Sequence, residues 1–354
     1  MAPSRQLRKI PSTMTGVVLT GHGGLDKLEY RHDLKVPTPG PEEVLIQVAA
    51  AGINNTDINT RIGWYSKGTT TATEEAHGST GPSQSDDATW SGTPLHFPRI
   101  QGADCCGYIV AVGSNVSPDR IGQRVLVSSI LRQPVNYEPY KCWTFGSECD
   151  GGFAQYTTAP ARDTYRGMLH RAKITAGETV VITGASGGVG LAAVQLVKRR
   201  EARVIAVCGH AKAEDVRAAG ADLTINRGDS IHERLDKNSV NVVVDLAAGP
   251  AFGELLDVLK RGGRYATAGA IAGPLVQLDV RTLYLKDLTF FGCTFQEDEV
   301  FANLIEYIER DEIRPYVGKT FPLGEIRAAQ EHFLSKATCG KLVLEIPEAV
   351  AEEG

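Results

Sequence analysis

A glycine-rich turn at residues 184–190 carries the clearest chemical signal in the sequence. An apolar, β-branched run at 179–183 precedes it, apolar residues at helical spacing follow from Val189, and a second apolar run occupies 204–208. Glycines let a backbone approach a pyrophosphate, and the first N–H groups of a helix bind its charge. Strand, turn, helix and strand within about thirty residues therefore predict a dinucleotide site rather than an ordinary tight α/β turn.

The turn fits the dinucleotide motif in two frames. With Gly187 and Gly190 as the second and third motif glycines, Ala185 takes the first position, whereas a frame that begins at Gly188 ends in alanine. We therefore expect the cofactor phosphates to contact the whole turn: Ala185, Ser186, Gly187, Gly188, Val189 and Gly190.

The same turn also has the G-x-S-x-G pattern of a hydrolase nucleophile. Ser186 would be the nucleophile, and Asp245 and His332 follow in the chain order of such hydrolases. This pattern occurs by chance in many glycine-rich turns, so the dinucleotide interpretation is favoured over the hydrolase.

The end of the second strand distinguishes the two nicotinamide cofactors. An NAD site places Asp or Glu there to accept hydrogen bonds from the ribose hydroxyls. The segment from Cys208 to Lys212 has no carboxylate and ends in a cation. Lys212 is the best candidate partner for a 2′-phosphate, with His210 and Arg227 as helpers, although it could equally be a solvated helix residue. NADP(H) is favoured over NAD.

Length and composition limit the class of protein. With 354 residues, two domains are expected, and 42% apolar residues, 22% charged residues and a net charge of −5 are typical of a globular protein. This balance argues against affinity for nucleic acid or anionic membranes. No apolar run reaches the roughly eighteen residues of a membrane span. The basic N-terminus lacks the apolar segment of a secretory signal, and seven cysteines without C-x-x-C spacing suit the cytoplasm.

The distribution of apolar runs predicts two kinds of architecture. Before the turn, short strands separated by Gly and Pro indicate an all-β domain, at residues 15–20, 28–34, 43–51, 100–112, 122–128 and 151–158. From the turn onward, strands alternate with helices, as in a doubly wound α/β domain. These strands are expected at 179–183, 204–208, 222–225, 240–246, 263–268 and 288–292, with helices at 189–200, 214–220, 251–260 and 297–310. A turn region near 319–323, a helix at 326–334 and a strand at 341–346 follow.

Two other stretches need an interpretation. The loop 52–65 concentrates Asn, Asp, Arg and Tyr after a buried strand, so it carries chemistry or is a polar turn that caps a short helix. Residues 66–94 are rich in Ser, Thr and Gly and are expected to form a mobile insertion, either a disordered loop or a lid. Cys142 and Cys149 are too few for a structural zinc lobe, and they form a pair or remain thiols.

Several motifs in a fixed order give the chain a family resemblance. They are GGLDKLEY (23–30), PGPEEVLIQVAAAGIN (39–54), NTDINTRIGWY (55–65), FPRIQGADCCGYIVAVG (97–113), GGFAQY (151–156), GASGGVGLAAVQL (184–196), GAD (220–222), LYLKDLTFFGCTF (283–295) and GKLVLEI (340–346). The chain resembles the zinc-independent quinone oxidoreductase branch of the medium-chain alcohol dehydrogenase superfamily. The resemblance implies a GroES-like β domain (1–162 with 312–354), a Rossmann domain (163–311), an active site between them, NADP(H) and a homodimer.

The resemblance also implies roles for individual residues. Positions that hold zinc ligands in zinc-using relatives correspond to Asn54 and to 102–104 (Gly-Ala-Asp), which would not hold zinc well. Tyr65 is expected to donate a hydrogen bond to the substrate, Asn54 to orient it, and Asp57 and Arg61 to be structural. The resemblance also places further residues at the cofactor: Ala247, Ala268, Gly269, Ala270 and Lys341.

Without a Lewis acid, hydride transfer to an electron-poor acceptor such as a quinone or an enone is the favoured reaction. The alternatives are a zinc-free alcohol or aldehyde oxidoreductase and an NADP(H)-binding sensor without turnover. Residues 159–176 are shorter than the corresponding segment of the family. This difference is either an omission of residues from the sequence or a true deletion that would rebuild the hinge. An omission predicts a Cα–Cα distance between Arg166 and Gly167 that departs from the normal value of about 3.8 Å.

Overall fold

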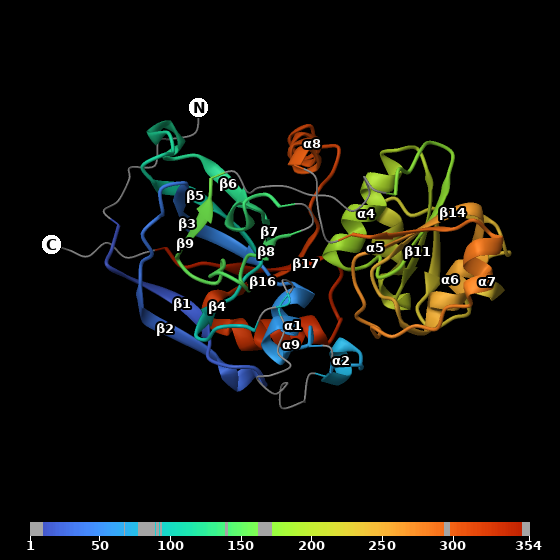
Figure 1. The fold of residues 1–354 in the computed structure, drawn as a ribbon, viewed down its shortest axis with the longest axis horizontal. Helices are drawn as coiled ribbons and strands as arrows, with labels where there is room; N and C mark the ends of the chain where they lie inside the picture. Colours follow the sequence, from blue (N-terminus) through green and yellow to red (C-terminus); the bar gives the residue numbers. More distant parts are fainter. Residues whose placement is uncertain are drawn as a thin grey trace.

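The structure is a computed structural model that describes residues 10–66, 68–76, 89, 92, 94–138, 141–161, 172–293 and 298–348. Two parts lie side by side, one built mainly from β-strands and one from a parallel sheet with helices (Figure 1). The C-terminal strands return to the β-rich part. The expected α/β class with a β domain and a doubly wound domain is confirmed.

The parallel sheet has six strands in the order β12-β11-β10-β13-β14-β15, and every neighbouring pair is parallel. This is the doubly wound order that binds dinucleotides at the point where the strand order reverses, beside the first strand. The strands are β10 (Thr179–Ile182), β11 (Arg203–Cys208), β12 (Leu223–Asn226), β13 (Val240–Asp245), β14 (Leu259–Thr267) and β15 (Thr289–Gly292).

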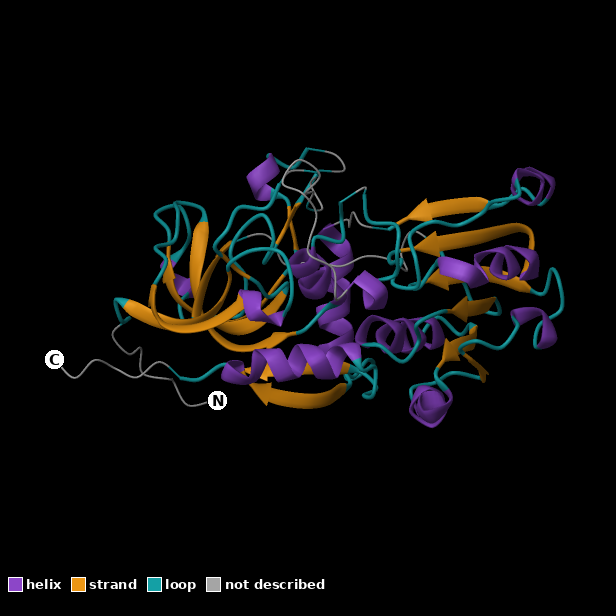
Figure 2. Cartoon of the chain, turned by 90° about the horizontal axis from the view of Figure 1, so that it is seen from below, coloured by secondary structure: helices purple, strands orange, loops and turns teal. Residues whose placement is uncertain are grey.

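Helices cover both faces of this sheet. Val180 and Ile182 of β10 pack in one buried cluster with α4, and Val181 packs in a second cluster with α6. Because both faces are buried, the strands read as continuous apolar runs rather than alternating ones. The helices are α4 (Gly188–Lys198), α5 (Ala213–Ala218), α6 (Phe252–Val258) and α7 (Val280–Leu285). Figure 2 shows the strand arrowheads directed toward the β domain.

The β domain combines segments from both ends of the chain. Its main sheet has the order β16-β17-β3-β5-β6, with β9 also paired to β3, and smaller sheets are β2-β1-β4 and β7-β8. The strands are β1 (Thr13–Leu19), β2 (Leu28–Lys35), β3 (Glu43–Gly52), β4 (Arg99–Ile100), β5 (Asp104–Val112), β6 (Arg124–Val127), β7 (Ile130–Leu131), β8 (Trp143–Thr144), β9 (Tyr156–Pro160), β16 (Val317–Pro322) and β17 (Lys341–Glu345). Its helices are α1 (Asn55–Ile62), α2 (Thr73–Ala76) and α9 (Ile326–Leu334), and α8 (Asp298–Glu309) precedes β16.

The expected turn region at 319–323 is wrong, because residues 319–322 belong to strand β16 and Leu323 begins a short 3-10 helix. Gly318 and Pro322 give it the composition of a turn, but β16 pairs in parallel with β17. The hydrogen bonds that fix this strand come from a partner that follows later in the chain, so local composition could not predict it.

The insertion predicted at 66–94 begins with ordered structure. Thr73 at the start of α2 is buried, its hydroxyl donates to Asn59 Oδ1 at 3.1 Å, and its N–H donates to the Ile271 carbonyl at 3.3 Å. The described start of the insertion therefore packs against α1. Most of residues 77–93 lie outside the described residues, as does the predicted irregular spacing at Arg166–Gly167.

Other expectations concern thiols, charge and membranes. All seven cysteines are free thiols, so Cys142 and Cys149 do not form a disulfide.

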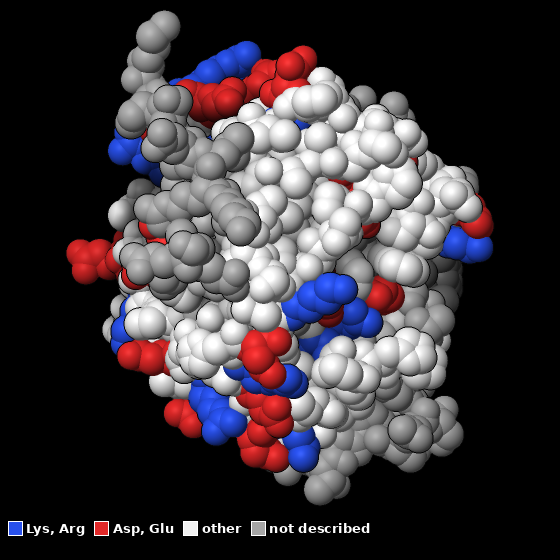
Figure 3. Space-filling view, turned by 90° about the vertical axis from the view of Figure 1, so that its left-hand side faces the viewer, with Lys and Arg blue, Asp and Glu red and all other residues white. Residues whose placement is uncertain are grey.

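On the face shown in Figure 3, Lys and Arg lie beside Asp and Glu rather than forming a basic patch. None of the helices in the described part of the chain is long and apolar enough to cross a membrane.

Candidate active site

The glycine turn joins β10 to α4 with the geometry that a phosphate needs. Gly184 has a left-handed φ of 60°, and Gly187 precedes the first residue of α4 in extended conformation, without a side-chain cap on the helix. A Cβ on Gly190 would lie 2.3 Å from the Gly184 carbonyl oxygen, so only glycine allows this helix to start so close to the strand. The uncapped N–H groups at the start of α4 can therefore bind a pyrophosphate, and this cradle fits a dinucleotide.

A buried carboxylate supports the neighbouring loop. Asp245 at the end of β13 is 0% exposed, and its oxygens accept hydrogen bonds from the Thr183 and Tyr265 hydroxyls, both at 2.5 Å. The N–H groups of Ala247 and Ala248 also donate to it, each at 2.9 Å. Burial and this carboxylate raise the pKa of Tyr265. Asp245 thus holds the loop that carries the predicted cofactor residue Ala247.

These contacts remove the basis for a hydrolase triad. Asp245 is already engaged by two hydroxyls and two N–H groups. His332 lies on α9 of the β domain, where its Nε2 contacts the Thr338 hydroxyl at 2.5 Å. None of the hydrogen bonds found in the described residues links the side chains of Ser186, His332 and Asp245.

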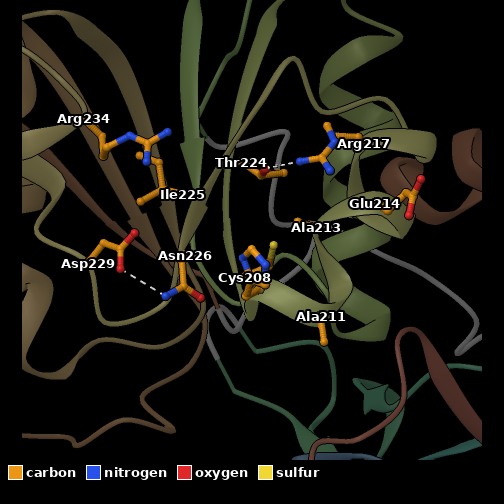
Figure 4. Close-up of a pocket in the computed structure, with 11 residues that line it drawn as sticks. Cys208, Ala211, Ala213, Glu214, Arg217, Thr224, Ile225, Asn226, Asp229 and Arg234 are labelled. Carbon is orange, nitrogen blue, oxygen red and sulfur yellow. Dashed lines mark hydrogen bonds between the residues drawn. The ribbon is translucent and has the colours of Figure 1, made fainter.

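A cavity of about 660 Å³ lies at the carboxyl ends of β11 and β12, next to the start of α5 (Figure 4). Cys208 and His210, two of the residues that the sequence suggests for the adenosine end of a dinucleotide, line this cavity. The other lining residues are Ala211, Ala213, Glu214, Arg217, Thr224, Ile225, Asn226, Asp229 and Arg234. Glu214 and Asp229 bring carboxylates that the strand end itself lacks.

The cations at this cavity differ from those predicted. Lys212 is not among the lining residues, because its Nζ donates to the Thr338 carbonyl at 2.9 Å, and burial lowers its pKa. The exposed Arg227 does not line the cavity either. Arg217 and Arg234 do, and Arg217 donates to the Thr224 hydroxyl at 2.6 Å. Arg217 follows Lys212 by five residues in the same helical region, a spacing that could have indicated it.

The segment before β17 binds the glycine turn directly. The Gly340 N–H donates to the Ser186 carbonyl at 2.8 Å, and the Cys339 thiol donates to the same oxygen at 3.3 Å. Gly187 and Gly340 also form an isolated parallel bridge. The β domain therefore meets the doubly wound domain at the cofactor turn, which places residues that follow Gly340 beside the start of α4.

Lys341 is the first of these residues, and its side chain reaches the predicted substrate loop. Its Nζ donates to Asn54 Oδ1 and forms an ion pair with Asp104 Oδ2 at 2.5 Å. A Cβ on Gly52 would lie 2.5 Å from Lys341 Cε, so the glycine leaves room for the side chain. We call Gly52, Asn54, Asp104 and Lys341 the ammonium site. The side chains of Lys341 and Asp104 are 26% and 43% exposed, so a small molecule can approach them.

The other polar residues of the loop hold α1 in place. Asp57 is 2% exposed, and its carboxylate accepts from the N–H groups of Asn54, Gly102 and Ala103 at 2.8, 3.2 and 3.1 Å. Burial raises the pKa of Asp57 to about 7. Arg61 is fully buried and donates to Gln330 Oε1 at 2.9 Å and to the Gly23 carbonyl at 2.5 Å.

Tyr65 follows α1 after the left-handed Gly63 and is partly buried. Its hydroxyl donates to Thr56 Oγ1 at 3.1 Å. Thr56 lies on the first turn of α1, two residues after the ammonium-site residue Asn54, which is the N-cap of this helix. The two predicted catalytic residues, Tyr65 and Asn54, therefore lie at opposite ends of α1 and are linked through that first turn.

The residues at the expected zinc position do not fit a zinc ion. The oxygens of Asn54 and Asp104 accept from the Lys341 ammonium, and a cation already occupies the space between them. In the described part of the chain, no three His, Cys, Asp or Glu side chains are grouped so that they could hold a metal ion. Thiolate and imidazole, the ligands that zinc prefers, are absent from these two positions.

Comparison with known proteins gives matches over both parts of the chain. A family model described as "Alcohol dehydrogenase GroES-like domain" matches residues 40–168, and one described as "Zinc-binding dehydrogenase" matches residues 188–310. A quinone oxidoreductase from Lama guanicoe is 28% identical over 350 residues, covering 94% of this chain and 97% of its own. An acryloyl-coenzyme A reductase from Metallosphaera sedula is 28% identical over 366 residues, covering 94% and 99%.

A solved structure is more similar still. It is of a candidate alcohol dehydrogenase from Sinorhizobium meliloti, which is 41% identical and superposes with a TM-score of 0.83. The match covers 96% of this chain and 98% of that one. Both the β domain and the doubly wound domain are thus shared over nearly the full length.

Proposed function

The chain belongs to the medium-chain alcohol dehydrogenase/reductase superfamily, and on that basis we propose that it is a zinc-independent, NADPH-dependent reductase. It transfers a hydride to an electron-poor acceptor, either a quinone or an α,β-unsaturated carbonyl compound. The proposal has three parts: the position of the site, the class of acceptor and the choice of cofactor.

The observation that carries the proposal is the contact between the glycine turn and the segment that leads into Lys341. The hydrogen bond from Gly340 to Ser186 puts Lys341 and Asn54 next to the start of α4. A dinucleotide bound at that helix start supplies a hydride to a molecule held in the same junction. The polar groups around that molecule are hydrogen-bond donors rather than metal ligands, which suits reduction of an acceptor that is already electron-poor.

The named relatives support this class of acceptor. One is a quinone oxidoreductase and another acts on acryloyl-coenzyme A, in which a double bond is conjugated to a thioester carbonyl. Both kinds of acceptor take a hydride at carbon and leave negative charge on an oxygen. We therefore propose Tyr65 as a donor toward that oxygen and Asn54 as the residue that orients the substrate.

A second candidate function is a zinc-free alcohol or aldehyde oxidoreductase. The similarity to the candidate alcohol dehydrogenase from Sinorhizobium meliloti favours it. The two functions differ in the acceptors that oxidise NADPH, since an aldehyde has no conjugated double bond to accept a hydride.

NADPH is favoured over NADH because of the cations around the adenosine end. Arg217 and Arg234 line the cavity, and no carboxylate lies at the end of β11 itself. Glu214 and Asp229 work against this preference by opposing a phosphate's charge. We expect Arg217→Ala to raise the KM for NADPH more than that for NADH, whereas a 2′-phosphate bound by Lys212 would give this pattern with Lys212→Ala instead.

We also propose a homodimer that forms through the outer edge of the parallel sheet. Strand β15 ends this sheet, and it lies close to α7 in the chain. Exposed apolar side chains gather on these elements and the loop before them: Leu275, Val276, Val280, Tyr284, Leu285 and Phe290. A second copy would bury them. The free thiols suit a reducing cytoplasm as the location.

The proposed function is tested by following NADPH absorbance with a panel of quinones, enones and aldehydes, with and without a chelator. We expect oxidation with a quinone or an enone at the same rate in both conditions. Oxidation by aldehydes alone would favour the second candidate, and a rate abolished by the chelator would contradict zinc independence. Tight NADPH binding without any oxidation would indicate the sensor instead.

A further inference from the structure

We propose that the ammonium of Lys341 is a catalytic residue that stands where zinc-using relatives would hold their metal, and that it hydrogen-bonds the acceptor oxygen as negative charge develops there. This inference deepens the proposed function and rests on it. The positions that correspond to zinc ligands in zinc-using relatives here hold a cation of the chain itself, the Lys341 ammonium.

The lysine lies in a space that the backbone keeps open for it. A Cβ on Gly52 would meet Lys341 Cε at 2.5 Å, and one on Gly188 would meet Lys341 Cδ at 3.1 Å. Gly188 is the first residue of α4, and Gly52 is the last residue of β3. The Lys341 side chain thus extends from the glycine turn to the predicted substrate loop and passes between Gly188 and Gly52, which have no side chains.

The Lys341 ammonium has an N–H group that can bind the acceptor oxygen. A lysine ammonium carries three N–H groups and no acceptor. In the described residues, the hydrogen bonds and ion pairs found for Nζ go to Asn54 and Asp104. The third N–H can face a ligand, since 26% of the side chain is exposed. A preorganised donor of this kind stabilises charge that forms in the transition state.

The reaction then balances without a metal. NADPH gives a hydride with its electron pair to the β-carbon of an enone. The electrons of the carbon–carbon double bond move toward the carbonyl, and its oxygen takes the negative charge, which the Lys341 ammonium and the Tyr65 hydroxyl stabilise. A proton from water completes the saturated product, so NADPH and one proton are consumed and NADP⁺ is released. A quinone gives its hydroquinone in the same way.

Asp104 is a positioning residue in this scheme. Its carboxylate forms the ion pair that fixes Nζ, and it lies at the start of β5, which pairs with β3 and its terminal Gly52. Without this carboxylate the Lys341 ammonium should keep its charge but no longer be held where it can donate to the acceptor oxygen. The effect of Asp104 therefore passes through Lys341.

The test compares four variants of the full-length protein with one control. Lys341→Met removes the charge and should lower kcat with an enone by roughly 100-fold, the usual effect of losing one oxyanion donor. Lys341→Arg should recover part of this loss. Gly52→Ala should displace the lysine tip and lower kcat, and Asp104→Asn should act similarly. Gly253→Ala in α6, where an added Cβ meets nothing within 4 Å, is the matched glycine control and should leave kcat unchanged.

Two readouts separate catalysis from other roles of the lysine. The Kd for NADPH, measured by fluorescence titration, should change by less than about threefold in Lys341→Met, because the role lies in the transition state. The absorbance of 4-nitrophenol bound to the NADP⁺ complex should show its phenolate form at lower pH in the wild type than in Lys341→Met. Charge stabilisation causes that shift, and a merely structural lysine would not.

The outcomes are distinct. A large rise in the Kd for NADPH with unchanged kcat would assign Lys341 to the cofactor phosphates and overturn the inference. Equal kcat and equal nitrophenol titration in wild type and Lys341→Met would also overturn it, while the proposed function would stand. A wild-type protein that oxidises NADPH with none of the acceptors would contradict the proposed function, and the inference with it.

Discussion

The cofactor turn and the ammonium site meet at Gly340 and Lys341 but are built in different ways. The turn at 184–190 offers backbone N–H groups from one continuous segment, and its neighbour Asp245 is fully buried with four hydrogen bonds. The ammonium site uses side chains from three distant segments, joined by a partly exposed ion pair. The first region should therefore govern stability and cofactor binding, whereas the second should govern the rate of chemistry and contribute little to stability.

Asp245→Ala should give the largest loss of stability. The change leaves the Thr183 and Tyr265 hydroxyls and two N–H groups without their acceptor in a buried site. We expect the free energy of unfolding to fall by at least about 3 kcal/mol, measured by urea denaturation. The exposed Asp236 of the same domain is the control, and its change to Ala should cost no more than about 0.5 kcal/mol. Equal losses at both positions would contradict a supporting role for Asp245.

Gly190→Ala should come next. Its Cβ would lie 2.3 Å from the Gly184 carbonyl oxygen, so the turn and α4 must separate. We expect a loss of about 1–3 kcal/mol in stability, together with weaker NADPH binding.

The control variant for this prediction should change the free energy of unfolding in the opposite direction. Gly253 is also helical and has nothing within 4 Å of an added Cβ. Gly253→Ala should therefore stabilise the protein by up to about 1 kcal/mol through helix propensity. If thermal unfolding showed Gly190→Ala to be stabilising as well, the close approach at the turn would be wrong.

The buried Asp57 should give stability a pH dependence. Burial raises its pKa from the ordinary 3.8 to about 7 in the folded protein, so the folded state holds this proton more tightly than the unfolded chain. Between these two values stability must fall as pH rises, and the contribution levels off below about pH 4 and above about pH 7.

The matched variant for this effect is Asp57→Asn, which cannot titrate. From pH 5 to pH 7 we expect the wild type to lose about 2 kcal/mol more than the variant in the free energy of unfolding, measured by urea denaturation at each pH. Parallel pH profiles for the two proteins would show that Asp57 is ionised in the folded state throughout this range.

Asp104→Asn should have the smallest effect on stability. The ion pair between Asp104 and Lys341 is partly exposed, and such pairs contribute at most about 1 kcal/mol. Turnover should fall nonetheless, because the ammonium loses its position. If Asp104→Asn lowered the free energy of unfolding as much as Asp245→Ala, the ammonium site would contribute strongly to stability, and the difference between the two regions would be contradicted.

The sequence alone predicts well those features that a single continuous segment of the chain forms. The strand, turn and helix from 179 to 200 agree with β10, the glycine turn and α4, because apolar period and glycine position are local properties. Strand β16 is not predictable in this way, since its hydrogen-bonding partner β17 is brought to it by the tertiary structure. The partnership of Asn54 with Lys341 spans 287 residues and has no local signal.

The cations near the cavity at the ends of β11 and β12 show the same limit. Its distance from the strand end indicates Lys212 as a phosphate partner, but the direction of its side chain depends on the Thr338 carbonyl from the C-terminal segment. Arg217 lines the cavity in its place because α5 turns that position toward β12, where Thr224 accepts from it. Position along the chain leads to this part of the fold, but only packing shows which side chains line the cavity.

The most direct test of the central claim follows the hydride itself. Protein freed of metal by a chelator is mixed with an enone and with NADPH that carries deuterium at the transferable position of its nicotinamide, and the product is examined by mass spectrometry and NMR. The zinc-free reductase predicts a saturated product that carries a single deuterium at its β-carbon. Product without deuterium, or product formed only when zinc is restored, would contradict it.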